Sequence, residues 1–450
     1  MFITKKVLMF AFCALFCGNS FAQNVLKPHF TEESKKIVIP KEGAVSPEIH
    51  DGMITIHKYP QQMFVNAKSG EYVWGTDFVF SRGNDWRTPY FSGGAMMAWR
   101  TKPNDYSPTP FIIYPDGKYR DLPADIQNAS SFCEGYALVQ KGTSVIMGVK
   151  QMFIDKNGKE VFPALTSTAR GTFGDMTIYP VRENRRVYYN AELKKYGYAD
   201  DKGNIIIKPQ FDKALNFSEG MAAVMMEENY VQKWGFIDLT GKMVIAATYK
   251  LRPGRFSEGL AAVRIGDSDY DYEMSYIDKT GKRVMENKKW NLNEFHNGFA
   301  WVGTGCEKLF VMNREFKEVR DVTKDFYYNG NGFGVCQFGM LTGDVQDKVW
   351  GIDFPNGMQS LNQSGIGEGD IFAPDGTILF QCVDAKGNGV SLHSITEGDL
   401  MFCKVSIENA PQLKEKNAYL SCFINKKGEI IYYFEEGVEG YEGIKPAQMK

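Results

Sequence analysis

Three glutamates recur at one place in a repeated motif, and paired carboxylates are the groups that hydrolyse glycosidic bonds. Glu134, Glu219 and Glu258 each stand directly before a glycine in the pattern Phe-x-Glu-Gly. A residue that returns in successive copies of a motif serves each copy rather than one reaction centre. Carboxylates beside glycine are well suited to accept hydrogen bonds from turn amides. We therefore predict that these glutamates satisfy backbone N–H groups, and we assign no catalytic residue.

A second acidic cluster has part of the spacing of a calcium-binding loop. Asp267, Asp269 and Asp271 stand at its first, third and fifth positions, and Asp278 falls at the twelfth. Tyr272, however, occupies the sixth position, where such a loop requires glycine. We interpret the cluster as a solvated acidic loop and predict neither a metal site nor a cofactor.

Other catalytic patterns are missing from the sequence. The five histidines show no metal-ligand spacing: His29, His50, His57, His296 and His393. The chain contains no Gly-x-Ser-x-Gly elbow, no phosphate-binding loop and no His-Glu-x-x-His motif. These absences disfavour a hydrolase of a familiar type.

One stretch has the chemistry of a partner-binding loop. Arg185, Arg186, Tyr188 and Tyr189 lie in the segment 182–195, which interrupts an otherwise regular spacing and is rich in charge and tyrosine. Insertions between repeats tend to lie on one face and often bind. Tyrosine and arginine together suit a carbohydrate or a protein, through ring stacking and charged hydrogen bonds. We predict these four as partner-binding residues, with an exposed loop that binds nothing as the alternative.

The motifs belong to a tandem repeat. Its closing glycines at 220, 259 and 298 are 39 residues apart, and a fixed period near 40 is typical of tandem structural repeats. Earlier copies close, on the same reading, at Gly52, Gly94, Gly135 and Gly174.

Each repeat reads as a set of short strands. Trp234 to Asp238 forms one strand, Asp238-Leu-Thr-Gly241 a type I turn, and Met243 to Ala246 the returning strand. Strands such as Leu260 to Val263 are apolar on both faces, which indicates that small sheets cover one another. The prediction is an all-β fold of antiparallel repeats of about 40 residues with propeller-like stacking of small sheets. An open β-solenoid is the alternative.

The N-terminus has the pattern of a secretory signal peptide. Lys5 and Lys6 precede an apolar run, and Ser20-Phe21-Ala22 forms a small-x-small cleavage site. We expect removal of residues 1–22 and a periplasmic, cell-surface or secreted protein without a transmembrane segment in the mature chain. Residues 23–45 then read as a lead-in, 46–303 as regular repeats, and 304–450 as diverged repeats with a C-terminal cap.

The charge and the cysteine content limit the classes of ligand and covalent bond that we expect. The 52 basic and 54 acidic residues give a formal net charge of −2, without the basic footprint of a nucleic-acid binder. Six cysteines follow the cleavage site, and no pair has the Cys-x-x-Cys spacing of a zinc cluster. An even number in an exported protein permits disulfides, while buried single thiols are the alternative. They are Cys133, Cys306, Cys336, Cys382, Cys403 and Cys422.

The motifs together resemble a known family. Trp-Gly followed by an aromatic residue and Ile-Asp-x-x-Gly, with a Phe-Ser-Glu-Gly close, resembles the bacterial WG-repeat (KWG-repeat) proteins over about residues 46–303. The resemblance implies a secreted or envelope-associated repeat protein and brings no catalytic residues. We therefore expect a non-catalytic protein that presents a surface to a protein or carbohydrate of the cell envelope. The alternative is an envelope enzyme, such as a glycan-active hydrolase, with its site after residue 304.

Overall fold

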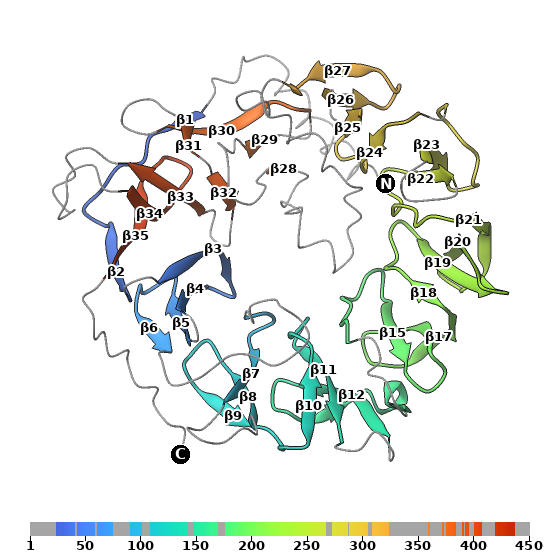
Figure 1. Ribbon diagram of the computed structural model, residues 1–450, viewed down its shortest axis with the longest axis horizontal. Coiled ribbons are helices and arrows are strands. Elements are labelled where there is room, and N and C mark those ends of the chain that lie inside the picture. Colours follow the sequence, from blue (N-terminus) through green and yellow to red (C-terminus); the bar gives the residue numbers. More distant parts are fainter. Residues whose placement is uncertain are drawn as a thin grey trace, which may run out of the picture.

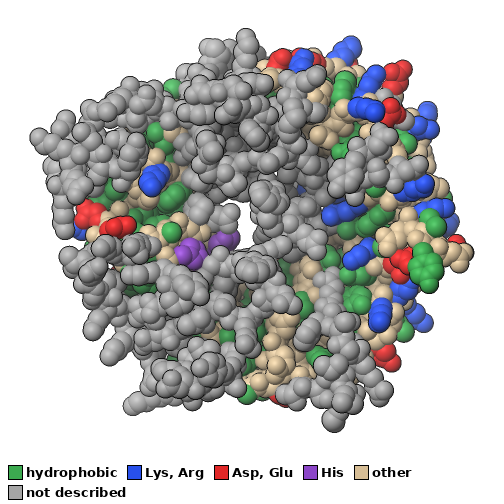
Figure 2. Space-filling view, viewed as in Figure 1, with side chains coloured by type: hydrophobic (Ala, Val, Ile, Leu, Met, Phe, Trp, Pro, Cys, Tyr) green, Lys and Arg blue, Asp and Glu red, His purple; other side chains and the backbone are tan. Residues whose placement is uncertain are grey.

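The computed structural model forms a ring of small β-sheets (Figure 1). It describes residues 24–40, 43–58, 61–74, 91–100, 109–142, 148–169, 176–266, 272–286, 288–304, 308–323, 359–360, 371–372, 375–383, 389–390, 392–395, 400–406 and 419–436. The predicted signal peptide at 1–22 lies outside these ranges. In the described part of the chain, the strands form nine sheets, and a 3-10 turn occupies Pro163–Leu165. The sheets surround a central opening that the space-filling view also shows (Figure 2).

Seven sheets follow one another along the chain. The first sheet contains β3 (Ala44–His50), β4 (Met53–Lys58), β5 (Gln61–Asn66) and β6 (Tyr72–Trp74), and the second contains β7 (Met96–Arg100), β8 (Thr109–Ile113) and β9 (Tyr119–Asp121). The third sheet contains β10 (Ile126–Ala129), β11 (Tyr136–Lys141), β12 (Val149–Asp155), β13 (Glu160–Val161) and β14 (Ser167–Ala169). The fourth sheet contains β15 (Arg186–Asn190), β16 (Lys195–Ala199) and β17 (Ile205–Phe211), and the fifth contains β18 (Lys213–Ala214), β19 (Met221–Glu228), β20 (Val231–Asp238) and β21 (Met243–Tyr249). The sixth contains β22 (Leu260–Gly266) and β23 (Tyr272–Asp278), and the seventh contains β24 (Asn291–Leu292), β25 (Phe299–Thr304), β26 (Lys308–Asn313) and β27 (Glu318–Asp321).

The last two sheets each combine both ends of the chain. One joins β1 (Asn24–Leu26) to β28 (Gln359–Ser360), β29 (Ile371–Phe372), β30 (Ile378–Val383) and β31 (Gly389–Val390). The other joins β2 (Lys35–Ile39) to β32 (Leu392–Ile395), β33 (Met401–Ser406), β34 (Tyr419–Ile424) and β35 (Ile430–Glu436). β1 pairs with β30 and β2 with β35, both in parallel, whereas the other named strand pairs are antiparallel.

These two N-terminal strands close the ring. Figure 1 shows β1 and β2, in blue, beside the orange and red strands of the C-terminal sheets. In an open solenoid the edge strand β35 would expose its backbone hydrogen-bonding groups, which is a liability for any sheet. β2 instead covers that edge over five register pairs, from Lys35↔Tyr432 to Ile39↔Glu436. The all-β, propeller-like arrangement is thus confirmed, and the chain does not adopt the open alternative.

The hydrophobic core lies between neighbouring sheets. One buried cluster combines Met221 and Phe236 of the β18–β21 sheet with Ala261 and Ile277 of the β22–β23 sheet. Because each sheet is covered on both sides, successive residues of a strand are apolar. This stacking is the reason that the strands lack the alternation of apolar and polar residues expected of a half-exposed sheet.

The Trp-Gly signature is explained by a close contact between two strands. The register between β20 and β21 shifts across Gly235, between Trp234 and Phe236, and this shift marks a bulge. A Cβ atom at Gly235 would lie 2.6 Å from the carbonyl oxygen of Ile245. Any larger residue at position 235 would collide with the backbone of β21, so this contact requires glycine.

The closing motif is a tight turn with two left-handed residues. In the turn from Ser257 to Leu260, Glu258 has φ 51° and Gly259 has φ 81°, the signature of a type I′ turn. The turn from Arg182 to Arg185 has the same form, with Glu183 at φ 51° and Asn184 at φ 58°.

This turn corrects one repeat boundary. The sequence predicts that the fourth unit closes at Gly174, which lies outside the described residues. The closing turn stands instead at 182–185, where Asn184 takes the place of glycine. Asparagine adopts the left-handed region more readily than other non-glycine residues, and a search for glycine alone overlooks it.

Replacing Gly259 with valine should lower the free energy of unfolding by more than about 1 kcal/mol, because a β-branched residue would be held at positive φ. No atom lies within 4 Å of the added Cβ position, so the cost comes from backbone conformation and not from a clash. Gly259→Asn is the matched control and should cost less, since Asn184 occupies the equivalent position. Urea unfolding of both variants measures the difference. Equal midpoints for the two variants would contradict the conformational explanation.

Candidate functional site

The predicted partner-binding stretch is largely a buried strand. Arg186, Tyr188 and Tyr189 belong to β15, which pairs with β16 in a regular hairpin. Arg186 is 1% exposed and Tyr188 is 2% exposed, while Arg185 and Tyr189 are partly buried. The expectation of an exposed insertion is therefore wrong for this segment. Its residues form the closing turn of a repeat and the first strand of the β15–β17 sheet.

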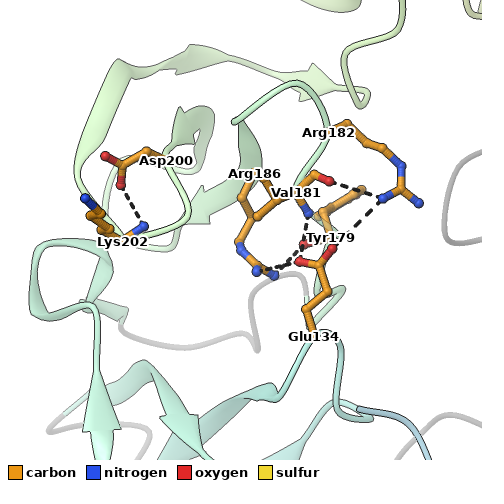
Figure 3. A network of polar contacts seen from close by, with 7 residues as sticks. All are labelled: Glu134, Tyr179, Val181, Arg182, Arg186, Asp200 and Lys202. Carbon is orange, nitrogen blue, oxygen red and sulfur yellow. Dashed lines mark hydrogen bonds and ion pairs between the residues drawn. The ribbon is translucent and has the colours of Figure 1, made fainter.

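Arg186 joins two sheets from the inside (Figure 3). Its Nη1 donates a hydrogen bond to the carbonyl oxygen of Tyr179 at 2.6 Å, and its Nη2 donates to Oε2 of Glu134 at 2.9 Å. The guanidinium also lies 5.7 Å from the centre of the Tyr136 ring. Glu134 and Tyr136 belong to the preceding β10–β14 sheet, so this arginine holds one repeat against the next.

The other predicted residues also make contacts within the protein. Arg185 donates through Nε to the carbonyl oxygen of Leu239 in the following repeat, at 3.0 Å. The Tyr189 ring lies 4.9 Å from that of Tyr196. Burial raises the pKa of Tyr188 to about 12, because its phenolate would be formed inside the core.

The turn carboxylates form a chain of hydrogen bonds from one sheet to the next. The Glu183 carboxylate accepts from the Gly220 N–H at 2.8 Å, and Glu219 accepts from Gly259 at the same distance. Glu258 continues the series to Gly298, and Asp51 begins it at Gly94. Glu134 accepts from Val181 at 3.0 Å. The prediction that these acids accept hydrogen bonds from backbone amides is confirmed. Glu219 and Glu258 bond the closing turn of the following repeat, and Glu134 bonds the amide next to that turn.

A serine hydroxyl repeats the same connection. Ser218 Oγ donates to the carbonyl oxygen of Phe256, and Ser257 Oγ donates to that of Phe295, both at 2.6 Å. The Phe-Ser-Glu-Gly motif thus supplies a buried ring, a donor and an acceptor that all act between neighbouring sheets.

The acidic cluster with calcium-like spacing has one described member. Asp267, Asp269 and Asp271 lie outside the described residues. Asp278 Oδ1 accepts hydrogen bonds from Oγ1 of Thr280 and from the backbone N–H groups of Thr280 and Lys282. The Thr280 side chain and then these backbone bonds lower the pKa of Asp278. Within the described ranges, no group of three or more His, Cys, Asp or Glu residues is arranged to hold a metal ion.

One exposed surface was not predicted from the sequence. The β19–β20 hairpin ends in the segment 226–233, in which every residue is exposed. It includes three large apolar side chains: Met226 at 42%, Tyr230 at 96% and Val231 at 47% exposure. Figure 2 shows hydrophobic and acidic side chains together over this hairpin, at the margin of the ring. The sequence feature that could have predicted this hairpin is the dipeptide Asn229-Tyr230, which joins the two pairing strands. It was overlooked because a hairpin turn is usually recognised by Asn-Gly.

Comparisons with known proteins identify the repeat. The WG containing repeat family matches residues 196–230 and 234–267. No curated protein matches the sequence. Within the described ranges, no helix is long and apolar enough to span a bilayer.

Several solved structures are similar to this chain over much of its length. BamB from Moraxella catarrhalis is 9% identical with a TM-score of 0.35, covering 76% of this chain and 98% of its own. A eukaryotic initiation factor is 12% identical with a TM-score of 0.49, covering 84% and 94%. An uncharacterized protein from Listeria monocytogenes EGD-e is 12% identical with a TM-score of 0.31, covering 64% and 97%. At these values none of the three informs the function of this chain.

The family match coincides with the two repeats in which Gly197 and Gly235 approach a bulged strand. Residues 196–230 and 234–267 of this chain are therefore WG containing repeats, as the sequence predicts.

Proposed function

We propose that this is an exported, non-catalytic repeat protein whose ring presents a binding surface to a protein of the cell envelope, with the β19–β20 hairpin as the anchor. The observation that carries the proposal is the exposed apolar tip formed by Met226, Tyr230 and Val231. Aromatic side chains dominate the energetic centres of protein interfaces. An almost fully exposed tyrosine at the end of a projecting hairpin has the features of such a centre.

The backbone of the tip supports a role other than stability. Asn229 has φ 51° and Tyr230 has φ 61°, so a bulky aromatic residue occupies a left-handed position that glycine would fill without strain. That conformation costs about 1–2 kcal/mol for an L-residue. Tyr230 recovers little of this cost through burial, because 96% of its surface is exposed. Strained residues of this kind are concentrated at functional sites.

The shape and charge of the tip favour a protein over a glycan. Small ligands such as sugars bind in concave sites that bury most of their surface, whereas this hairpin is convex. Glu227 and Glu228 flank the apolar side chains, and Gln232 donates to the Glu227 carboxylate at 2.8 Å. The surface that fits this tip is an apolar pocket of a protein with basic groups at its rim.

Export and the secondary contacts belong to the same proposal. The charged, apolar and small-x-small segments of residues 1–22 support secretion to the periplasm, the cell surface or the medium. Arg185 and Tyr189, the partly exposed members of the stretch first predicted to bind, are proposed as a secondary contact. The alternative, an envelope enzyme, would have its site after residue 304. The described residues of that region offer no observation that favours an enzyme.

Exchange of Met226, Tyr230 and Val231 for serine should leave folding intact and weaken partner binding by at least about 2 kcal/mol. The protein is recovered from the exported fraction, where its intact mass should correspond to a chain that begins at Gln23. A photoreactive residue at position 230 should crosslink a specific envelope protein. Leu193, which is 57% exposed on a different hairpin, is the matched control position.

The affinity of that crosslinked protein for the wild type and the triple-serine variant then completes the test. Equal affinity, or equal crosslinking from positions 230 and 193, would contradict the proposed anchor. A glycan that binds the triple variant as tightly as the wild type would contradict the choice of a protein partner.

A further inference from the structure

Three cysteines from two sheets meet in one hydrophobic core. Cys382 lies on β30, Cys403 on β33 and Cys422 on β34, and each is 0% exposed. They share a buried cluster with Leu26 of β1 and Val405 of β33. The Sγ atoms of Cys403 and Cys422 are 3.4 Å apart, and Cys382 makes a side-chain hydrogen bond with Cys403. In contrast, Cys133 lies elsewhere and is partly exposed.

The strand register makes two of these cysteines suitable for a disulfide. Cys403 and Cys422 stand directly opposite each other in the antiparallel pair β33–β34. Opposed residues in such a pair have Cα atoms about 4.5–5.5 Å apart, which lies within the range of about 4.4–6.8 Å found in disulfides. The sulfurs need only approach to about 2.05 Å, a movement that side-chain rotation can supply.

We propose that Cys403 and Cys422 are an oxidation site, and that they form a cross-strand disulfide in the exported protein while Cys382 remains a thiol beside them. The oxidant is a disulfide of another molecule. The Cys403 thiolate attacks that disulfide, forms a mixed disulfide and releases one thiol. The Cys422 thiolate then attacks the Cys403 sulfur and releases the second thiol. Two protons leave the cysteines, and the two electrons reduce the oxidant to two thiols.

Burial requires the reaction to precede the completion of the sheet. A hydrogen bond from Cys382 lowers the pKa of the Cys403 thiol, but the bond with Cys422 and desolvation raise it well above its usual value. The thiol is also inaccessible in the folded protein. Oxidation therefore takes place while β33 and β34 are still open, and the finished disulfide resists reduction until the sheet unfolds.

The position of this pair connects it to ring closure. β34 lies between β33 and β35, and β35 carries the closing strand β2. A bond between β33 and β34 restricts the unfolded C-terminal segment, and so favours the sheet on which β2 assembles. The inference rests on the proposed export, because an oxidising compartment is required for a lasting disulfide.

Peptide mapping of exported protein tests the assignment. The protein is purified without reductant, denatured, treated with iodoacetamide and digested. We expect Cys403 and Cys422 to be joined, and Cys382 and Cys133 to be alkylated. Alkylation of both Cys403 and Cys422, or a bond between Cys382 and Cys403, would overturn the proposal.

Refolding separates this proposal from that of export. A chain without residues 1–22, refolded in a glutathione redox buffer, should form the same bond even if export of the full chain fails. Its melting temperature should fall by at least about 2 °C when reductant is added during unfolding. Cys133→Ser should keep this response, and the double variant Cys403→Ser with Cys422→Ser should lose it. An equal response in the double variant would also overturn the proposal.

Discussion

Replacing Phe256 with alanine is expected to lower the free energy of unfolding by about 3–5 kcal/mol, the usual cost of deleting a buried aromatic ring. Phe256 is 0% exposed and packs edge-on against Phe236, with ring centres 5.0 Å apart. Its ring fills the core between the β18–β21 and β22–β23 sheets, so the cavity would open between two repeats. Urea denaturation followed by tryptophan fluorescence measures the loss.

Tyr230→Ala is the matched aromatic control for this change. Because the tyrosine is 96% exposed, its removal should alter the unfolding free energy by less than about 0.5 kcal/mol. A loss below about 1 kcal/mol for Phe256→Ala would show that the repeat motif does not build the core. A comparable loss for both variants would show that the hairpin tip is part of the folded core after all.

Ile37→Ala should destabilise the ring at its closure by about 2–5 kcal/mol. Ile37 is 2% exposed in the middle of β2, where it stands opposite Phe434 of β35. Its side chain belongs to the cluster that joins the β2–β35 sheet to the β3–β6 sheet. Loss of this contact should lower both the unfolding free energy and the hydrogen-exchange protection of the β35 amides, since β2 covers that edge.

Lys35→Ala, two residues earlier on the same strand, provides the control. The Lys35 side chain is exposed, and its Nζ donates a long hydrogen bond of 3.4 Å to the carbonyl oxygen of Ser69. Its replacement should change stability by less than about 0.5 kcal/mol. Unchanged protection of β35 in Ile37→Ala would mean that the ring does not depend on its N-terminal strand.

The repeat motif predicted local structure well because each of its residues acts at short range. Glycine at positive φ and aspartate at the start of a turn restrict the backbone whatever the surroundings. Asp238, Gly241 and Gly259 accordingly stand in the turns that the sequence predicts. The glutamates beside glycine were also interpreted correctly as acceptors for turn amides.

The expected exposure of the candidate binding residues was wrong for Arg186 and Tyr188, and the reason is specific. Arg186 and Tyr188 are polar or amphipathic, and a charged stretch in an irregular interval resembles a surface loop. Arg186 is nevertheless buried, because its two Nη atoms donate to the nearby carbonyl oxygen of Tyr179 and to the carboxylate of Glu134 in the preceding repeat. The burial of Arg186 depends on a contact with another repeat, and the spacing of residues within its own segment does not indicate that contact.

The sequence alone determined the all-β class, the period near 40 residues and the stacking of small sheets, since strand periodicity and turn residues express local backbone preferences. Tertiary structure alone decided that the array closes into a ring, because closure depends on parallel pairing between β2 and β35 across almost the whole chain. It also decided which side chains are exposed at the margin and which cysteines meet, because Cys382 comes from a different sheet than Cys403 and Cys422. Contacts between distant segments depend on how the repeats stack, and the type of a residue does not indicate which residue it contacts in the next sheet.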